Sequence, residues 1–207
     1  MTSAAAGIRQ IFFDIGGVLG SNGWDREQRE TAAQHFGVDP EDLQYRHEET
    51  VGAFEAGQIA LDEYLDVTVF WTPRPFTREQ FKAYMFSLST PWEESIAVAR
   101  RLRSVTSARM ATLNNEAREL NQYRIQHFGL SELFEVFFSS CWLGTRKPTR
   151  EIYERALGMS QADPRRALFI DDREQNLAPA RLLGIHTILF TGAERLSQDL
   201  RAMGYEL

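Results

Sequence analysis

The chain reads Ile11-Phe12-Phe13-Asp14-Ile15-Gly16-Gly17-Val18-Leu19 near its start, an apolar run that ends in one carboxylate and two glycines. An Asp at the carboxyl end of a buried strand lies where open α/β sheets bind their ligands. Gly16 and Gly17 carry no Cβ, so backbone N–H groups in this turn can approach an anion closely. Asp14 can therefore act as a nucleophile, as a metal ligand or only as the cap of a helix.

Length and composition are those of an ordinary globular protein with one or two domains, because 43% of the 207 residues are hydrophobic and 25% are charged. The net charge of −6 argues against nonspecific binding to nucleic acid or to an anionic membrane. Cys141 is the only cysteine, which excludes an intrachain disulfide and fits a reducing compartment. Residues 1–7 show no signal peptide, and no apolar run is long enough to span a membrane, so we expect a cytoplasmic protein.

Five short apolar runs alternate with amphipathic helical patterns along the chain. Each run is apolar on both faces, as expected for parallel strands that are covered by helices. The capping-box spacing of Thr90 and Glu93, with Pro91 between them, predicts that a helix begins there. The alternation predicts an α/β fold with a Rossmann-like, doubly wound parallel sheet. The expected strands are residues 8–13, 108–113, 135–138, 167–170 and 186–190.

Residues 22–88 are the exception, because they hold no convincing strand. Helical patterns begin there at Asp25, Asp39, Leu61 and Thr77. The spacing of Thr77 and Gln80 is that of a second capping box. About four helices between the first two strands indicate an inserted α-helical bundle. We therefore expect a Rossmann-like core of residues 1–20 and 89–207 and a helical cap of residues 21–88.

Polar clusters follow the first four predicted strands. The carboxyl ends of the strands converge on one crevice in a doubly wound sheet, so these side chains should share one site. Besides Asp14, the clusters are Asn114-Asn115 after the second strand, Lys147-Pro148 after the third and Asp171-Asp172 after the fourth.

The chemistry that these residue types share is phosphoryl transfer. Asp14, Asp171 and Asp172 concentrate negative charge, which is costly unless a cation neutralises it. Ligands that are all oxygen select a hard ion, and Mg²⁺ is the ion we expect. Lys147 supplies a further positive charge, and Asn114 can donate an amide N–H to a phosphate oxygen.

Taken in this order, the motifs resemble those of the haloacid dehalogenase (HAD) superfamily, in the branch whose first motif reads Asp-x-Gly-Gly-Val. Residues 138–189 also resemble the phosphatase domain of bifunctional soluble epoxide hydrolases. The resemblance implies a Rossmann-like core with a mobile helical cap inserted after the first strand. The matching stretches are residues 13–19, 113–115, 143–148 and 169–176, continued by 177–185.

The resemblance also implies a two-step reaction, in which Asp14 attacks phosphorus and water then hydrolyses the aspartyl-phosphate. Lys147 and Asn114 would be the other catalytic side chains. The implied metal ligands are Asp14, the backbone carbonyl of Gly16, Asp172 and, directly or through water, Asp171. The implied phosphate-binding residues are Ile15, Gly16, Asn114, Asn115 and Lys147.

Two positions depart from the family pattern. Gly16 stands where family phosphatases usually carry an Asp that serves as general acid and base, and Asn114 stands where they usually carry Ser or Thr. The loss of such an acid typically slows a reaction by about 10²–10⁴-fold. Both departures weaken the expectation of efficient catalysis.

Three functions therefore stay open. The first is a HAD-like hydrolase that acts as a Mg²⁺-dependent phosphatase on a small phosphorylated metabolite, for example a sugar phosphate. The second is a metal-free dehalogenase in which Asp14 attacks carbon; the Asp171-Asp172 pair argues against it, because no cation would offset those charges. The third is a catalytically weak binding protein that keeps the fold. A monomer and a homodimer fit equally well, and Trp24 is the cap residue that we expect at the substrate pocket.

Overall fold

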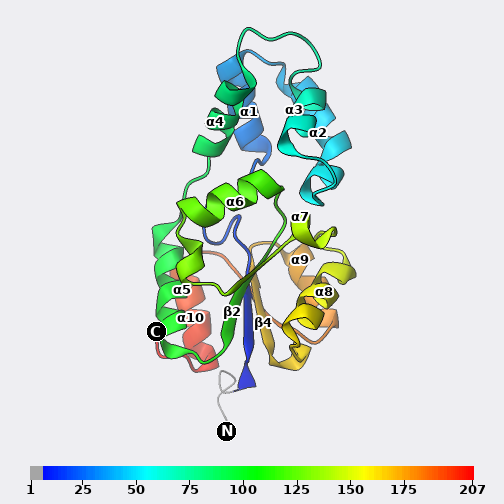
Figure 1. The fold of residues 1–207 in the computed structure, drawn as a ribbon. Helices are drawn as coiled ribbons and strands as arrows, with labels where there is room; N and C mark the ends of the chain where they lie inside the picture. Colours follow the sequence, from blue (N-terminus) through cyan, green and yellow to red (C-terminus); the bar gives the residue numbers. More distant parts are fainter. Residues whose placement is uncertain (1–6) are drawn as a thin grey trace.

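The computed structural model describes residues 7–207. Five parallel strands form one sheet in the order β3-β2-β1-β4-β5 (Figure 1). The predicted α/β fold with a doubly wound parallel sheet is confirmed. Residues 1–6, which we assign to the core and in which we expect no signal peptide, lie outside the described residues. The strands are β1 (Gln10–Phe13), β2 (Arg109–Asn114), β3 (Val136–Ser139), β4 (Ala167–Asp171) and β5 (His186–Leu189).

Helices cover both faces of the sheet. In Figure 1, α5 (Glu93–Val105) and α10 (Ala193–Met203) lie on one side, and α8 (Arg150–Ser160) and α9 (Glu174–Leu182) lie on the other. Side chains of β1 point alternately to the two faces, so Phe13 joins the apolar cluster of α5 and α10, whereas Phe12 joins that of α8 and α9. β1 and β4 are buried along their whole length, whereas the edge strands β3 and β5 are partly exposed.

Four helices lie between β1 and α5 and form the upper part of the molecule in Figure 1. They are α1 (Arg26–Phe36), α2 (Pro40–Glu55), α3 (Leu61–Thr68) and α4 (Arg78–Ser87). Their apolar cluster also contains Leu120 of α6 (Arg118–His127), which follows β2. The four helices therefore pack on α6. The exact limits of the cap, residues 21–88, stay a prediction.

The two predicted capping boxes have different outcomes. Thr77 caps α4 by accepting a hydrogen bond from the backbone N–H of Gln80, as predicted. The prediction for Thr90 is wrong, because α5 begins at Glu93 with Trp92 as its N-cap residue. The Thr90 carbonyl instead accepts a hydrogen bond from the Ser21 backbone N–H at 2.9 Å. The strand-like pairing of these two segments joins the points at which the chain leaves and re-enters the core.

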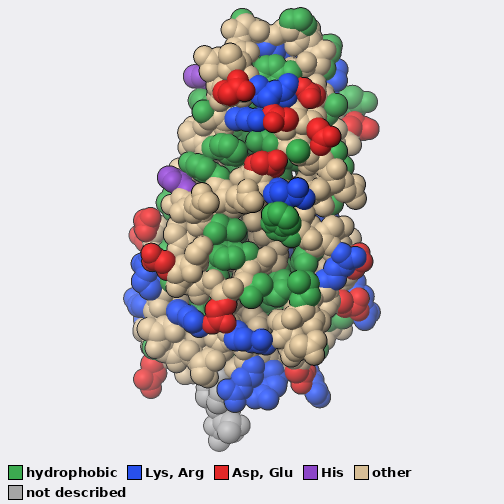
Figure 2. Space-filling view, viewed as in Figure 1, with side chains coloured by type: hydrophobic (Ala, Val, Ile, Leu, Met, Phe, Trp, Pro, Cys, Tyr) green, Lys and Arg blue, Asp and Glu red, His purple; other side chains and the backbone are tan. Residues whose placement is uncertain are grey.

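The surface carries mixed charge. Lys and Arg side chains are interspersed with Asp and Glu over most of the face shown in Figure 2, and no single sign covers it. Between residues 7 and 207, none of the helices has both the length and the apolar character needed to cross a bilayer.

Candidate active site

The register of the sheet brings three carboxylates together. Phe13, the last residue of β1, lies beside Ile170 of β4, so the next residues along the chain, Asp14 and Asp171, emerge side by side. Asp172 follows directly. Each of the three offers a carboxylate oxygen that lies within 4.8 Å of the other two. The structure therefore assembles at one point the carboxylates that the sequence places at two strand ends.

Lys147 lies between two of these carboxylates. Its Nζ is 2.8 Å from Oδ2 of Asp14 and 2.7 Å from Oδ2 of Asp171. Burial alone would lower the pKa of Lys147, but the two carboxylates outweigh that effect and raise it. Asn115 fixes the backbone here, because its side chain accepts from the Lys147 N–H at 2.8 Å and donates to the Lys147 carbonyl at 2.9 Å.

Asp14 is a carboxyl group in an unfavourable place for negative charge. Burial raises its pKa to about 8, and the neighbouring charges of Asp171 and Asp172 act in the same direction, although Lys147 opposes them. A further positive charge beside Asp14 would favour its ionised form. Only that form can act as a nucleophile or as a ligand.

Asp171 and Asp172 differ in how their oxygens are satisfied. Oδ1 of Asp171 accepts from the Asn176 side chain at 2.9 Å and from the Arg173 backbone N–H at 2.8 Å, while Oδ2 accepts from Lys147. Oδ1 of Asp172 is buried, and no group in residues 7–207 donates a hydrogen bond to it. An unsatisfied carboxylate oxygen beside Asp14 fits a hard cation that takes oxygen ligands.

The two glycines after Asp14 are not equivalent. Gly17 has a φ of +74°, and a Cβ there would lie 2.4 Å from Oδ2 of Asp172. Gly17 is therefore required for both its conformation and its close approach to the carboxylate. Gly16 has room for a side chain, because its Cβ would come no nearer than 3.5 Å to any other residue.

A cavity of about 350 Å³, which we call the strand-end cavity, opens beside Asp14. Core residues form one part of its wall and cap residues the other. The core part includes Asp14, Gly16, Asn115, Lys147, Pro148, Arg173 and Asn176. The cap part includes Trp24, Arg29, His47, Val51 and Glu55.

Trp24 lines this cavity, as the sequence indicated. It adopts a φ of 49°, which is uncommon for a bulky residue, and its indole N–H donates to the Tyr64 hydroxyl at 2.8 Å. The same hydroxyl lies 2.9 Å from Nδ1 of His47. Burial lowers the pKa of His47 to about 3, so this imidazole is neutral near pH 7.

Two expected phosphate ligands have other hydrogen-bond partners. Asn114 is buried, donates to Oδ1 of Asn121 at 3.0 Å and accepts from the Ser139 hydroxyl at 2.9 Å. It is absent from the wall of the strand-end cavity. The backbone N–H of Ile15 donates to Oδ1 of Asp14 at 2.8 Å. Neither contact tests phosphate binding, so both assignments stay predictions.

Several residues of the cavity wall were not predicted. Glu55 from α2 forms an ion pair with Arg146 at 3.4 Å, and burial raises its pKa. Arg146 and Arg173 are next to the predicted site residues Lys147 and Asp172 in the chain, and this adjacency could have indicated that they line the cavity. Arg29 and Glu55 lie within polar helical patterns, which carry no local sign that these residues face a cavity.

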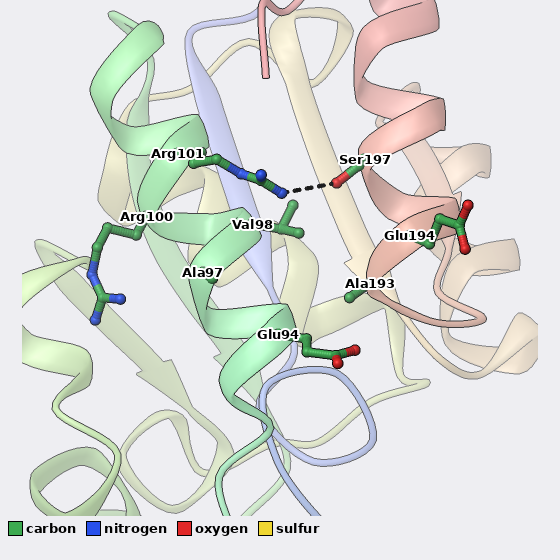
Figure 3. Close-up of a pocket in the computed structure, with 8 residues that line it drawn as sticks. All are labelled: Glu94, Ala97, Val98, Arg100, Arg101, Ala193, Glu194 and Ser197. Atoms are coloured by element: carbon green, nitrogen blue, oxygen red, sulfur yellow. Dashed lines mark hydrogen bonds between the residues drawn. The ribbon is translucent and has the colours of Figure 1, made fainter.

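A second hollow, of about 410 Å³, lies between α5 and α10 (Figure 3). Ala97, Val98 and Ala193 line it together with charged residues. Arg101 reaches from α5 to the Ser197 hydroxyl at 3.5 Å, while Arg100 points away from α10. It holds neither the carboxylate cluster nor the lysine, so the strand-end cavity is the candidate active site.

Solved structures with the same fold are found among HAD proteins. A HAD family enzyme from Bacteroides thetaiotaomicron superposes with a TM-score of 0.82 at 22% identity, over 94% of this chain and 98% of that one. The same enzyme in complex with magnesium and inorganic phosphate gives a TM-score of 0.72 at 23% identity, over 87% and 93%. An L-2-haloacid dehalogenase gives 0.63 at 19% identity, over 87% and 83%. Identities this low show the fold alone.

Sequence relatives match shorter stretches. Bifunctional epoxide hydrolase 2 of Rattus norvegicus is 42% identical over 60 residues, which are 29% of this chain and 11% of that protein. The chloroplast flavin mononucleotide hydrolase 1 of Arabidopsis thaliana is 36% identical over 75 residues, 36% of this chain and 31% of that protein. The model of the haloacid dehalogenase-like hydrolase family matches residues 8–184. This match covers all the motifs of the strand-end cavity, and the chain belongs to the haloacid dehalogenase-like hydrolases.

Proposed function

We propose that this hydrolase is a Mg²⁺-dependent phosphatase that cleaves a small phosphate ester through Asp14. The observation that carries the proposal is the environment of Asp14, which lies 2.8 Å from the Lys147 ammonium and in one cluster with Asp172, whose Oδ1 is buried and has no hydrogen-bond partner in the described residues. Dehalogenation by Asp14 would need no metal ion, whereas phosphoryl transfer makes use both of the ammonium and of a cation that the free carboxylate oxygen could bind.

Similar proteins also support a phosphatase over a dehalogenase. The HAD family enzyme from Bacteroides thetaiotaomicron has been crystallised with magnesium and inorganic phosphate. A sesquiterpene phosphatase of Aspergillus oryzae is 27% identical over 107 residues, 52% of this chain and 54% of that protein. The flavin mononucleotide hydrolase is also named for the cleavage of a phosphate ester.

The residues that would hold Mg²⁺ are Asp14, Asp172, the carbonyl of Gly16 and, directly or through water, Asp171. When bound, the ion offsets the clustered negative charge and polarises the phosphoryl group. Asp172 is the better direct ligand of the aspartate pair, because Asp171 already accepts from Lys147 and Asn176.

In the proposed reaction, a carboxylate oxygen of Asp14 attacks phosphorus, and the bond from phosphorus to the leaving oxygen breaks. Lys147 holds its ammonium beside the attacking carboxylate and stabilises the charge that develops on the phosphoryl oxygens. Water then attacks phosphorus, which releases phosphate and restores Asp14. Gly16 has no side chain to protonate the leaving group, so that proton comes from water or from the substrate.

We propose that Lys147, Asn115 and the backbone at Gly16 bind the transferred phosphate, because all three line the strand-end cavity. Ile15 and Asn114 would serve through a backbone N–H and a side-chain amide, respectively. Asn114 would act only after a shift, because its side chain lies outside the cavity wall and is bonded to Asn121.

Two assays test the proposal. The first measures the turnover of p-nitrophenyl phosphate in the presence of Mg²⁺ and in the presence of EDTA, and the second measures halide release from chloroacetate. Phosphate release that requires Mg²⁺ is the expected result. Mg²⁺ should also raise the melting temperature of the natural protein, because it binds the folded state. Asp172→Ala should lose that rise, and Asp66→Asn, a surface change in the cap, should keep it.

Two results would count against the proposal. Metal-independent halide release would favour the dehalogenase. No turnover of either substrate, together with a melting temperature that Mg²⁺ leaves unchanged, would favour a binding protein without this chemistry.

A further inference from the structure

The strand-end cavity carries an excess of positive charge. Six Arg and Lys residues line it against three Asp and Glu residues, although the whole chain has a net charge of −6. The face of the molecule in Figure 2 shows no comparable excess. Lys147 is paired with Asp14 and Asp171, and Arg124 with Glu116 at 2.6 Å. Arg26 is paired with Glu30, Arg146 with Glu55 and Arg173 with Asp172, so among the described residues Arg29 is the lining cation that forms no ion pair.

Arg29 of α1 is the lining residue whose positive charge no ion pair offsets. Only 6% of its surface is exposed, and it forms no ion pair with any carboxylate in residues 7–207. Its Nε and Nη2 donate to Oε1 of Gln44 at 3.0 and 2.7 Å, and Nη1 donates to the Trp24 carbonyl. Both acceptors are neutral, so the charge of Arg29 is buried without a directly bonded counterion, and the carboxylates of Asp25, Glu48 and Glu55 act on it only from beyond ion-pair distance.

The guanidinium also retains donors. Arginine has five N–H groups, and the three hydrogen bonds of Arg29 use one each. One N–H is therefore left on each terminal nitrogen. A buried charge without a counterion is costly, and burial lowers the pKa of Arg29 accordingly. An anionic ligand in the cavity would relieve this cost.

We infer that Arg29 binds a second oxyanion of the substrate, so that the preferred substrate is a phosphate ester that also carries a carboxylate or another phosphate. This inference rests on the proposed phosphatase function and narrows its substrate class. A guanidinium recognises such groups through paired N–H donors. The other unpredicted arginines are less suited, because Arg146 lies 3.4 Å from Glu55 and Arg173 lies 4.0 Å from Asp172.

The experiment measures binding by competition, so that it does not depend on how well each ligand is itself hydrolysed. The Mg²⁺-loaded enzyme cleaves p-nitrophenyl phosphate while two matched pairs of competitors are titrated. 3-Phosphoglycerate is compared with glycerol 3-phosphate, and fructose 1,6-bisphosphate with fructose 6-phosphate. The first pair tests a carboxylate as the second anion, and the second pair tests a phosphate.

The doubly anionic member of at least one pair should bind about tenfold more tightly to the natural protein, the effect of one charge-assisted hydrogen-bonded contact. Arg29→Met should reduce that preference to less than about twofold, within the error of such comparisons. Arg29→Lys, which keeps the charge but not the paired donors, should retain part of it. The kcat for p-nitrophenyl phosphate should change far less than these inhibition constants.

Arg46→Met is the control, because Arg46 lies on α2 outside the cavity wall and is paired with Asp42 at 2.9 Å. It should keep the full preference. Equal binding within both pairs by the natural protein would overturn the inference, and so would a preference that survives in Arg29→Met. If Arg29→Met fails to fold, the inference is still tested by comparing the preference for doubly anionic competitors in the natural protein and in Arg29→Lys. An absence of p-nitrophenyl phosphate turnover would instead refute the phosphatase function itself.

Discussion

The two sides of the strand-end cavity are built in different ways. On the core side, Asp14 and Asp171 stand where β1 and β4 end, so the pairing of two strands fixes their positions. On the cap side, Arg29 and Glu55 come from helices α1 and α2, and only the packing of those helices on each other and on the core brings them to the cavity. The difference teaches that the groups proposed to react are encoded next to strand ends, while the positions of those proposed to select a substrate depend on how helices pack.

The two sides also differ in charge. The core contributes three clustered carboxylates, which need a cation, whereas the cap contributes a buried guanidinium, which needs an anion. A phosphate ester that carries a second oxyanion, bound together with Mg²⁺, would satisfy both needs at once. Changes on the core side should therefore abolish the reaction, and changes on the cap side should alter its selectivity.

The largest effect is expected for Asp14→Asn on the core side. Loss of a nucleophile removes the reaction pathway, so kcat should fall by at least about 10⁴-fold while the circular dichroism spectrum is unchanged. Asp25→Asn is the matched change on the cap side. Asp25 caps α1 by accepting from the Gln28 N–H, and Asn can do the same, so activity should stay within about threefold. Substantial turnover by the Asp14 variant would refute the mechanism.

The two lysines of the chain give the next comparison, because Lys147 is in the core and Lys82 is in the cap. Lys147→Met should lower kcat by about 10²–10³-fold and abolish vanadate inhibition, since it removes the ammonium that we propose binds the phosphate. Lys82 forms a partly exposed ion pair with Asp62, and Lys82→Met should leave both quantities unchanged. Equal vanadate inhibition in all three proteins would exclude phosphate binding by Lys147.

A third comparison tests the contact between cap and core. Gly57 and Gly37 both have a left-handed φ, +69° and +64°. A Cβ at Gly57 would lie 2.1 Å from the Cys141 carbonyl oxygen in the core, whereas one at Gly37 would meet nothing within 4 Å. Each Ala variant pays about 1 kcal/mol for the backbone conformation, and Gly57→Ala must also displace the cap.

Denaturant unfolding should therefore show Gly57→Ala to be the less stable variant by roughly a further 1–2 kcal/mol, as expected for overpacking. Its activity should fall too, because the cap wall of the cavity moves. Gly37→Ala should keep its activity. Equal stability of the two variants would mean that the cap does not rest on Cys141 as the structure has it.

Much of the core could be predicted because its signals are local. The five strands are short apolar runs, and the carboxylates that follow two of them are adjacent in the chain to those runs. The Thr90 prediction failed because a distant segment, at Ser21, competes for the same backbone groups. Helix α10 was not predicted, since the residue that precedes it is Gly192, which has no side chain that could cap the helix.

The cap side was less predictable for a related reason. Arg29 is buried by α2, and its partner Gln44 is fifteen residues away on that helix. A polar helical pattern such as α1 reads as a solvated face, which is the more common fate of charged residues. Asn114 shows the same limit within the core, because its position at a strand end was foreseen but its bond to Asn121 was not.

The smallest effect, at Gly16, tests the point where core and cap meet. A Cβ at this position would lie 3.5 Å from the Cα of Asn22, at the start of the cap, and the residue has no left-handed φ. Gly16→Asp is therefore compatible with the fold, whereas Gly17→Asp would collide with Asp172 and should lose Mg²⁺ binding. The natural protein has no acid at position 16, so its rate should fall steeply as the leaving group becomes more basic.

Gly16→Asp should make the rate depend less steeply on the basicity of the leaving group. It should also raise kcat/KM for alkyl phosphates by roughly tenfold. This gain is smaller than the full effect of a general acid, because the residues around the new carboxyl group are not arranged to tune its pKa. The measurement is a series of phosphate esters of graded leaving-group pKa, run on the natural protein, Gly16→Asp and Gly16→Asn. The Asn variant has the same shape but cannot donate a proton as an acid, so it should not show the gain.

A flat dependence of the rate on leaving-group pKa in the natural protein would mean that another group protonates the leaving oxygen. Glu55 would then be the first candidate, because burial raises its pKa and it enters the cavity from the cap. In that event one reactive group, Glu55, would come from the cap. The core would then not supply all of the reactive groups, and the cap would do more than select the substrate.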